Sequence, residues 1–231
     1  MDEKYVQVDH FIDYDQEKIA DFIFQVIDRT CLTPAEKAVK LYYAVRDEVF
    51  YDPYTLSCNP IDYRASTILA RRRGFCVQKA VLLCALARAV GIPARLGFAT
   101  VTNHLASRKL MQFIGTHVFV FHGYTELWLD QRWIKATPAF NRELCGKYRV
   151  PPLEFNGRDD ALFQPYNSAQ KPFMEYIRYH GSFSTVPLPQ MLKAWTDFYG
   201  TERVQGWFDI KCSTFVKERS DFLQETPFNP E

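Results

Sequence analysis

The chain has 231 residues, of which 47% are hydrophobic and 16% are aromatic, so it is long enough to bury a substantial core within one domain. Its 28 basic and 27 acidic side chains leave a formal net charge of +1, which argues against the basic surface that nucleic-acid binding requires. The first ten residues carry no apolar signal core, and no run of about 18 uncharged apolar residues occurs. We therefore expect a cytoplasmic protein that does not contact membranes.

Two helices are predicted near the start of the chain. Apolar residues recur at helical spacing over residues 17–28, which indicates one buried stripe. The segment Thr33-Pro34-Ala35-Glu36 has the pattern of a capping box with proline at the first helical position, and it predicts a second helix that extends to about Phe50. Residues 51–73 are typical of an irregular connection, with a short helix over residues 65–70.

The next segment places a cysteine where a nucleophile is expected. Cys76 follows Gly74 and Phe75 at the start of an apolar helix that ends at Gly91-Ile92-Pro93. The partial positive charge at a helix N-terminus stabilises a thiolate, and the glycine lets a substrate carbonyl approach closely. By contrast, Cys84 lies two turns along the same helix and is expected to be a small buried hydrophobic residue.

Strand-like segments follow this helix. Residues 94–101 and 113–120 are predicted strands, and the second can continue into the run that begins at His122. A turn at Asp130 and Gln131 leads to a further strand over residues 132–139, so the sheet should be largely antiparallel. A cysteine on a helix followed by a histidine on a strand outlines a nucleophile and its base.

The last third of the chain is less regular. Beyond Pro151, about thirty residues are rich in Pro, Asn, Gly and Asp, which predicts a loop that covers a cleft or wraps the surface. Helices are predicted over Leu188–Tyr199 and Ser213–Leu223. We expect a single domain over residues 1–231, with a core of about 33–140 and a wrapping extension over 151–231.

Several of these residues together resemble the transglutaminase-like superfamily. They are Gly74-Phe75-Cys76, the helix end from Leu86 to Arg95, His122 and Trp133. The resemblance covers roughly residues 41–140 and is most specific over 73–95. It implies an α+β fold with a papain-like transglutaminase core, in which N-terminal helices and the cysteine helix pack on a mostly antiparallel sheet. The family pairs its cysteine with a histidine and an aspartate on neighbouring strands, and it includes transglutaminases, cysteine proteases, amidases and inactive relatives.

The third catalytic position departs from the family pattern. Where the family usually shows Asp-Pro-Thr, this chain has Thr137-Pro138-Ala139. If Asp130 and Gln131 form a two-residue hairpin turn, Thr137 becomes a diagonal neighbour of His122, with Cα atoms about 7 to 8 Å apart. A threonine hydroxyl can orient an imidazole but carries no charge to stabilise the imidazolium. We therefore predict the catalytic residues Cys76, His122 and Thr137, in a triad weaker than one with aspartate.

Other polar residues remain open as contributors to the site. The backbone N–H of Cys76 is the expected first donor to the oxyanion of acyl transfer. In the family a second donor commonly comes from the segment before the cysteine, which offers Tyr51, Tyr54, Asn59 and Tyr63. Residues that can fold back to assist His122 are Asn141, Asp159, Asp160 and Glu175.

Three further residues have simpler interpretations. His117 is the rival base, but the residues around His122 match the family's offsets better, so His122 is preferred. Glu126 is expected to support the sheet through an ion pair with its cross-strand partner Lys135. Lys79, one turn beyond Cys76, is interpreted as a charge on the solvated side of the helix.

These patterns favour a cysteine-dependent acyl transfer on an amide bond, with hydrolysis by a protease or amidase preferred over transfer to an amine. One alternative is a catalytically weak or inactive transglutaminase-like binding module, and another is a true protein-crosslinking transglutaminase. Metal binding by Cys76 and His122 is a weaker alternative, because no further ligands lie at useful spacing. We expect no cofactor, no metal and no nucleic-acid partner, and a peptide or other amide-containing substrate.

Overall fold

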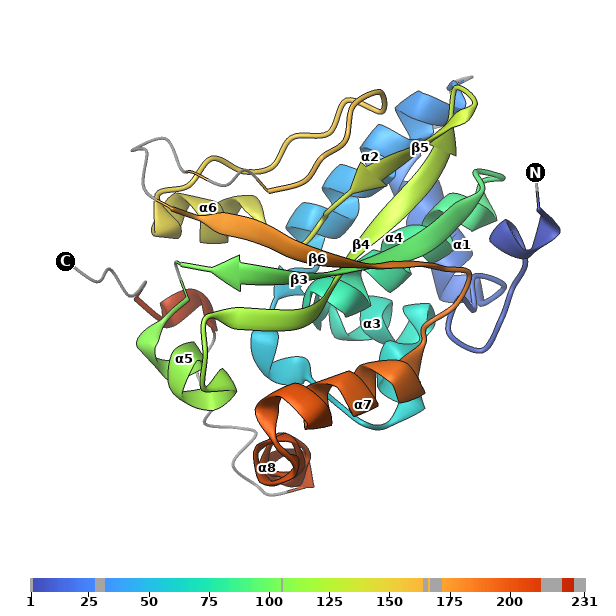
Figure 1. Ribbon diagram of the computed structural model, residues 1–231. Helices are drawn as coiled ribbons and strands as arrows, with labels where there is room; N and C mark the ends of the chain where they lie inside the picture. Colours follow the sequence, from blue (N-terminus) through green and yellow to red (C-terminus); the bar gives the residue numbers. More distant parts are fainter. Residues whose placement is uncertain are drawn as a thin grey trace.

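The computed structural model describes residues 2–27, 32–104, 106–163, 166, 172–212 and 222–226, in which helices pack against an antiparallel sheet (Figure 1). The α-helices of these residues are α1 (Glu17–Val26), α2 (Pro34–Glu48), α3 (Ala65–Arg71), α4 (Cys76–Ala89), α5 (Arg108–Ile114), α6 (Arg142–Tyr148), α7 (Leu188–Tyr199) and α8 (Thr201–Cys212). The strands are β1 (Phe50–Tyr51), β2 (Arg73–Gly74), β3 (Ala94–Asn103), β4 (Val118–Leu129), β5 (Arg132–Ala136) and β6 (Met174–Phe183). The predicted mixture of helices and a mostly antiparallel sheet is confirmed.

The main sheet has the strand order β5-β4-β3-β6, and each neighbouring pair is antiparallel. Asp130 and Gln131 both have positive φ, 46° and 62°, as a two-residue hairpin turn between β4 and β5 requires. Leu129 pairs with Arg132, which confirms the predicted register of this hairpin. The short strands β1 and β2 form a separate parallel pair just before α4.

The N-terminal helices follow the sequence signals closely. Helix α2 begins at Pro34 behind a complete capping box, because the backbone N–H of Thr33 donates to Glu36 at 2.8 Å and the backbone N–H of Glu36 donates to Thr33 Oγ1 at 3.3 Å. Helices α1 and α3 also form where they were predicted.

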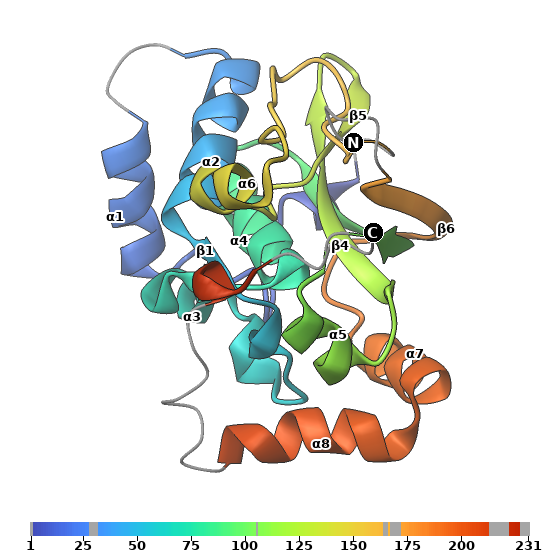
Figure 2. The ribbon, with the colours of Figure 1, turned by 90° about the vertical axis from the view of Figure 1, so that its left-hand side faces the viewer.

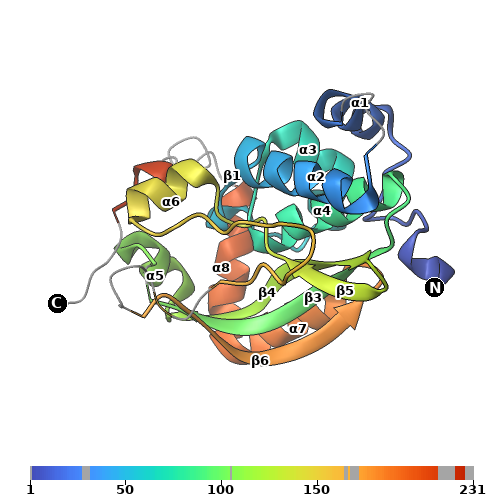
Figure 3. The same ribbon diagram turned by 90° about the horizontal axis from the view of Figure 1, so that it is seen from above.

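Helix α4 is the central element of the core. Every residue from Cys76 to Arg88 is buried, since α4 packs against β3 and β4 on one side and against α2 and α3 on the other. Figure 3 shows α4 between the sheet and these two helices. The largely apolar character of the segment reflects a helix enclosed on all sides rather than one with a solvated face.

Lys79 is enclosed together with the rest of α4. The interpretation of Lys79 as a charge on the solvated side of the helix was therefore wrong. The side chain is 0% exposed, and its Nζ donates to the backbone carbonyls of Arg46 at 2.9 Å and Val49 at 2.6 Å. These carbonyls belong to the C-terminal end of α2, where backbone acceptors lack helical partners. Burial lowers the pKa of Lys79 well below its usual value. The lysine therefore ties the end of α2 to the first turn of α4.

The segment before β4 is only partly a strand. Residues predicted to begin a strand at 113 instead end helix α5, which Ser107 caps by accepting from the backbone N–H of Leu110 at 3.0 Å. Gly115, with a φ of 86°, closes this helix in the left-handed conformation that glycine adopts readily. Strand β4 then begins at Val118 and runs through His122 without interruption.

Glu126 has a different partner from the one predicted. It stands opposite Lys135 in the sheet as expected, yet its carboxylate pairs with Arg95 on β3 and accepts from Ser182 Oγ at 3.0 Å. Lys135 instead pairs with Asp160 at 3.3 Å. The predicted ion pair was wrong because Glu126 has a basic neighbour on each side of its strand, and the sequence spacing identified only one.

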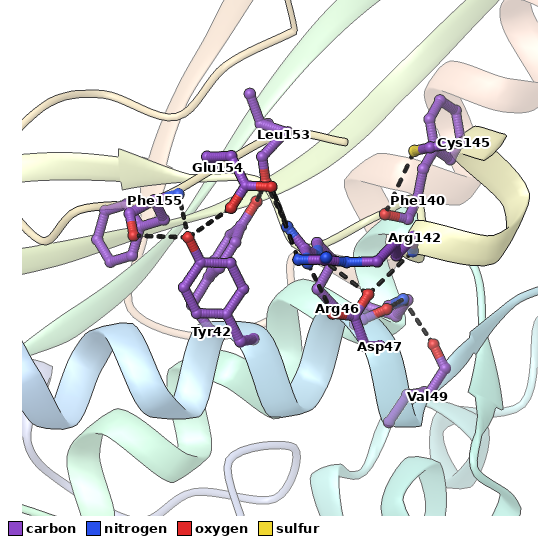
Figure 4. A network of polar contacts seen from close by, with 12 residues as sticks. Tyr42, Arg46, Asp47, Val49, Phe140, Arg142, Cys145, Leu153, Glu154 and Phe155 are labelled. Carbon is purple, nitrogen blue, oxygen red and sulfur yellow. Dashed lines mark hydrogen bonds and ion pairs between the residues drawn. The ribbon is translucent and has the colours of Figure 1, made fainter. Parts of the chain in front are cut away.

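The chain after Pro151 first runs along α2. Tyr42 and Arg46 donate to the carbonyl of Leu153 at 2.9 and 3.0 Å, and Tyr43 donates to the Glu154 carboxylate at 2.6 Å (Figure 4). These contacts explain how a segment without regular structure is held against a helix.

Among the described residues, no helix combines the length and the apolar character that crossing a lipid bilayer requires.

Later parts of this region contain elements that the sequence did not reveal. Strand β6 pairs with β3 at the edge of the sheet, and α8 follows α7 directly. The prediction for α7 is confirmed at Leu188–Tyr199. Most of the helix predicted over Ser213–Leu223 lies outside the described residues, and Phe222–Gln224 forms a single 3-10 turn, η5.

Candidate active site

Cys76 and His122 line one pocket. Cys76 is the first residue of α4, and His122 lies in β4; both side chains are buried, with 9% and 6% of their surface exposed. The space in the pocket that a water molecule can enter is about 40 Å³. Its other lining residues are mostly apolar or aromatic: Tyr51, Pro53, Leu56, Phe75, Ile114, Phe119, Val120, Phe121, Trp195, Tyr199 and Trp207. The structure thus brings together the predicted nucleophile and base.

Gly123 allows this close approach of strand and helix. A Cβ atom at this position would lie 2.8 Å from the Cα of Val77, which is closer than real side chains come. Without a side chain at this position, β4 crosses the first turn of α4 closely enough for the Gly123 backbone N–H to lower the pKa of the Cys76 thiol against the larger effect of burial. The sequence signal was available, because a glycine inside a strand often marks a close backbone approach; its role was missed.

A β-bulge lies next to His122. The register between β3 and β4 shifts between the pairs Ala99 with His122 and Val101 with Phe119. Within the bulge, Phe121 has a φ of 61°, an uncommon value for a residue with a side chain. Bulges redirect neighbouring side chains, and here the ring of Phe121 stacks on His180 at 4.5 Å while His122 lines the pocket.

Helices α7 and α8 form one wall of the pocket. Figure 2 shows them grouped with α5 near the start of β4. The Tyr199 hydroxyl accepts from the backbone N–H of Val120 at 2.7 Å and donates to the carbonyl of Val118 at 3.0 Å. Trp195 Nε1 donates to the carbonyl of Val120 at 2.9 Å. These bonds satisfy backbone groups of Val118 and Val120, in the part of β4 that does not pair with β5. The sequence did not indicate this wall.

Burial dominates the ionisation of the two central residues. It raises the pKa of the Cys76 thiol to about 11, although backbone N–H groups of Gly123, Val77 and Cys76 act in the opposite direction. Burial also lowers the pKa of His122 to about 4. At neutral pH the pair therefore rests as a thiol beside a neutral imidazole, rather than as a thiolate beside an imidazolium.

Thr137 is buried beyond the end of β5, with 1% of its surface exposed. Its backbone N–H donates to the carbonyl of Ala161 at 3.1 Å, and its own carbonyl accepts from the Tyr42 hydroxyl at 3.1 Å. Within the part of the chain that the structure describes, neither Thr137 Oγ1 nor His122 Nε2 has a hydrogen-bond partner. The predicted orienting contact between these two atoms is therefore not formed in this structure.

Tyr176 of β6 contacts the same region, and the sequence gave no reason to consider it. Its ring meets that of His122 edge to face, with centroids 5.9 Å apart. Its hydroxyl interacts with the Thr137 side chain, which lowers the pKa of Tyr176 against the larger effect of burial.

The other residues proposed to assist His122 have different contacts. Asn141 Oδ1 accepts from the backbone N–H of Tyr51 at 3.2 Å. Asp159 accepts from the Asn156 side chain at 2.8 Å, and Asp160 binds Lys135.

The two remaining candidates lie near the start of β4 and the neighbouring strands. Glu175 pairs with His104 at 3.1 Å. The rival base, His117, lies just before β4, with Nδ1 3.3 Å from the carbonyl of Asn103. His117 does not line the pocket that holds Cys76, so the geometry favours His122 as the base.

Of the four residues considered as second oxyanion donors, Tyr51 lines the pocket. Burial raises its pKa, and the nearby Cys76 sulfur adds to this effect. Tyr54 and Tyr63 donate to Glu225 at 2.8 Å and to the carbonyl of Ser57 at 2.8 Å. Asn59 caps the start of the 3-10 helix η3 (Pro60–Tyr63). Among the described residues, no group of three or more His, Cys, Asp or Glu side chains is placed to hold a metal ion.

The chain is similar to one family model and to one or more solved structures. The family model of the transglutaminase-like superfamily matches residues 22–138, slightly more than half of the chain. Among solved structures, the chain is similar to the crystal structure of a "putative cysteine protease" from Cytophaga hutchinsonii, with 18% identity and a TM-score of 0.43. That match covers 58% of this chain and 40% of the other, so this chain spans less than half of that protein's length. No match is found among curated proteins. On the family match, this chain belongs to the transglutaminase-like superfamily.

Proposed function

We propose that the protein catalyses acyl transfer from an amide bond through Cys76, with hydrolysis as the preferred outcome. The observation that carries the proposal is the shared pocket of Cys76 and His122 at the start of α4. A buried thiol alone is common in protein cores. A thiol and an imidazole that line the same small pocket have the elements of nucleophilic catalysis.

In the proposed reaction, the Cys76 sulfur attacks the carbonyl carbon of the substrate while His122 removes the thiol proton. His122 then returns this proton to the leaving nitrogen, which departs as an amine and leaves a thioester on Cys76. Water attacks the thioester with His122 as the base, and the products are a carboxylic acid and the free thiol. Because both groups rest in their neutral forms, the proton moves during the attack and not before it.

Two donors are available for the oxyanion that develops on the carbonyl oxygen. The backbone N–H of Cys76 lies at the N-terminal end of α4, where helical N–H groups have no internal partners. The Tyr51 hydroxyl is the proposed second donor, because Tyr51 lines the pocket beside the sulfur. Donors in a dry pocket stabilise developing charge more strongly than donors in water do.

The size of the pocket supports hydrolysis over crosslinking. The part of the pocket that the centre of a water molecule can reach measures about 40 Å³, so water has access to the sulfur and the imidazole. Water reaches a thioester in such a space more easily than a lysine side chain on a second protein. The aromatic lining further favours a substrate with a small apolar group next to the scissile amide.

A second candidate is a binding module with little or no catalysis. The unpaired Nε2 of His122 favours it, because no carboxylate among the described residues holds the imidazole or stabilises its charged form. In this case the pocket would bind an amide-containing segment without cleaving it.

Covalent trapping separates the two candidates. The protein is incubated with p-nitrophenyl acetate, quenched in acid and mapped by mass spectrometry. We expect acetylation of Cys76 that requires His122, with a rate that saturates as the ester concentration rises. Cys58→Ser is the matched control, because Cys58 is an exposed free cysteine far less suited to activation. Acetylation of Cys58 in preference to Cys76, or a Cys76 rate unchanged in His122→Ala, would refute the enzyme proposal.

The same intermediate distinguishes hydrolysis from transfer to an amine. Acetyl-Cys76 is allowed to react in buffer with and without glycine methyl ester. Predominant release of acetate in the presence of the amine supports hydrolysis, and predominant N-acetylglycine methyl ester supports transamidation.

A further inference from the structure

Four buried side-chain polar atoms have no hydrogen-bond partner within the described part of the chain: His122 Nε2, Thr137 Oγ1, Tyr148 OH and Tyr176 OH. Buried polar atoms in folded proteins are normally paired, so each exception needs a physical explanation. Tyr148 lines a different pocket, beyond Tyr51. The other three belong to one neighbourhood, because Tyr176 contacts both His122 and Thr137.

Strand β3 holds Tyr176 and His122 in this arrangement. His122 pairs with Ala99 of β3 from one side, and Tyr176 pairs with Val101 of β3 from the other. The two rings meet at an interplanar angle of 74° across this strand. Phe163, whose ring centroid is 6.0 Å from that of His122, covers the imidazole from the loop after Pro151.

The two nitrogens of the imidazole face different surroundings. Nε2 is buried without a partner, whereas the side chain as a whole lines the pocket that contains Cys76. Nδ1 is therefore the nitrogen available to the sulfur. To accept a proton, Nδ1 must be unprotonated, so the proton of the neutral ring must reside on Nε2 and needs an acceptor there.

We propose that Tyr176 is a positioning residue that supplies this acceptor in the place where the family carries an aspartate. Small rotations of the side chains would close two contacts that are open in this structure: the Nε2–H of His122 would donate to the Tyr176 hydroxyl oxygen, and the hydroxyls of Tyr176 and Thr137 would hydrogen-bond to each other. This inference rests on the proposed function, in which His122 is the base. The chain of hydroxyls fixes the tautomer and the ring orientation but leaves the imidazole without a neighbouring negative charge.

The contacts around Tyr176 support this role. Burial raises the pKa of its hydroxyl, while the Thr137 side chain and the backbone of Phe163 act in the opposite direction, as groups that donate to the oxygen do. The hydroxyl thus stays protonated at neutral pH, where it can both donate and accept a hydrogen bond. A neutral orienting group also agrees with the lowered pKa of His122, for which burial is the cause.

The test compares the wild-type protein with Tyr176→Phe, which removes only the hydroxyl. Nitrogen-15 NMR of the histidine rings reports the tautomer and the pKa of His122, and acetylation of Cys76 reports its action as a base. We expect the Nε2–H tautomer to predominate in the wild type, and a mixture with the Nδ1–H tautomer in the variant. The rate constant for acetylation should fall about tenfold at saturating ester, with little change in the half-saturating concentration.

Tyr179→Phe is the matched control. Tyr179 lies on the same strand and stacks on Tyr176 with ring centroids 5.9 Å apart, but it is 52% exposed. We expect this variant to leave both the tautomer and the acetylation rate unchanged. If Tyr176→Phe does not fold, Thr137→Val interrupts the same chain of hydroxyls and should shift the tautomer in the same direction.

The outcomes separate this inference from the proposed function. A slower Tyr176→Phe variant with an unchanged His122 tautomer would show a merely structural role and overturn the inference. A wild-type protein that shows no Cys76 acetylation would refute the proposed function, whereas the NMR measurement would still test the contact between Tyr176 and His122.

Discussion

The two sides of the His122 ring are built differently. On the side of the pocket, β4 passes so close to α4 that only a glycine fits at position 123, and the backbone N–H of Gly123 lowers the pKa of the Cys76 thiol against the effect of burial. Nε2, in contrast, is buried, and within the described residues neither it nor the hydroxyls of Tyr176 and Thr137 have a hydrogen-bond partner. The nucleophile is therefore held by the backbone, whereas the base is held by side chains alone.

This difference indicates which part of the candidate site depends on the fold itself. The geometry of the sulfur follows from the packing of strand on helix and changes only if the core changes. The orientation of the imidazole depends on a few side chains, which can be exchanged without altering the fold. Loss of the family's aspartate thus leaves the nucleophile in place and weakens the control over its base.

The largest effect is expected from Gly123→Ala, which attacks the side held by the backbone. The added methyl group would lie 2.8 Å from the Cα of Val77 and force β4 away from α4. We expect the acetylation rate of Cys76 to fall by about 100-fold or more, because small misplacements of reacting groups are costly. The free energy of unfolding should also fall by about 1 to 3 kcal/mol, as overpacked cores show.

Gly146→Ala is the control for this variant. Gly146 lies in α6, and a Cβ atom there would meet nothing within 4 Å. Chemical denaturation should show unchanged or slightly higher stability, since alanine favours a helix more than glycine does. Equal loss of activity in the two variants would contradict the close approach of β4 and α4.

The next effect concerns pH and the burial of His122. The pKa of His122 in the folded protein is about 4, below its ordinary value of 6.5. As the pH falls between these values, the unfolded chain binds the proton first, so stability is present above pH 6.5 and is lost towards pH 4. The loss attributable to His122 is about 3 kcal/mol, at 1.36 kcal/mol per pKa unit.

Urea denaturation from pH 4 to pH 7 measures this contribution by comparing the wild type with His122→Gln. As the pH falls from 7 to 4, the unfolding free energy of the wild type should decrease by more than that of His122→Gln. His180, whose pKa burial also lowers, is present in both proteins and does not affect the comparison. Parallel stability curves would show that His122 is not buried as a neutral group.

Thr137→Asp tests the side held by side chains by restoring the charge that the family carries. A carboxylate near Nε2 should raise the pKa of His122 and increase the acetylation rate of Cys76 about tenfold at neutral pH. Iodoacetamide labelling of Cys76 should shift to lower pH. In Thr137→Asn the new side chain has nearly the shape of aspartate but no charge. This variant should shift neither the pKa of His122 nor the pH at which Cys76 is labelled. No change in the aspartate variant, or loss of activity without unfolding, would remove Thr137 from the orienting position.

The smallest effect is expected from Tyr199→Phe. Its hydroxyl bonds to the backbone of Val118 and Val120, and removing it leaves these groups unpaired. We expect a loss of about 1 to 2 kcal/mol in unfolding free energy. Hydrogen exchange at the Val120 amide should become faster, while the exposed Tyr179→Phe should not alter it. Unchanged exchange in Tyr199→Phe would show that α7 does not support this part of β4.

The parts of the fold that the sequence predicted were encoded by local signals. The capping box at Thr33 and Glu36, the hairpin turn at Asp130 and Gln131, and the glycine-proline stop after α4 each depend on neighbouring residues. Such signals place an element without knowledge of its surroundings. They were sufficient for most of strands β3, β4 and β5 and for the cysteine helix, whereas the expectation that Cys76 and His122 act together also rested on the resemblance to the family.

The missed features depend on contacts between distant segments. Along strand β6 only Met174 is buried, so the sequence lacks the alternation of apolar and polar residues that marks a strand. The strand forms because it pairs with the free edge of β3. Lys79 looked like a surface residue because the carbonyls that receive it belong to another helix. Tyr176 was missed for the same reason, since its neighbours in space are far away in the chain.

The wall contributed by α7 and α8 has a consequence for divergence within the family. Trp195, Tyr199 and Trp207 lie outside the segment that matches the family model, whereas the thiol and the imidazole lie inside it. Cys76 and His122 are thus carried by one stretch of sequence, and the aromatic wall of their pocket by another. We expect proteins that share this core to have acquired different preferences by exchanging their C-terminal helices, while the chemistry of the sulfur stayed the same.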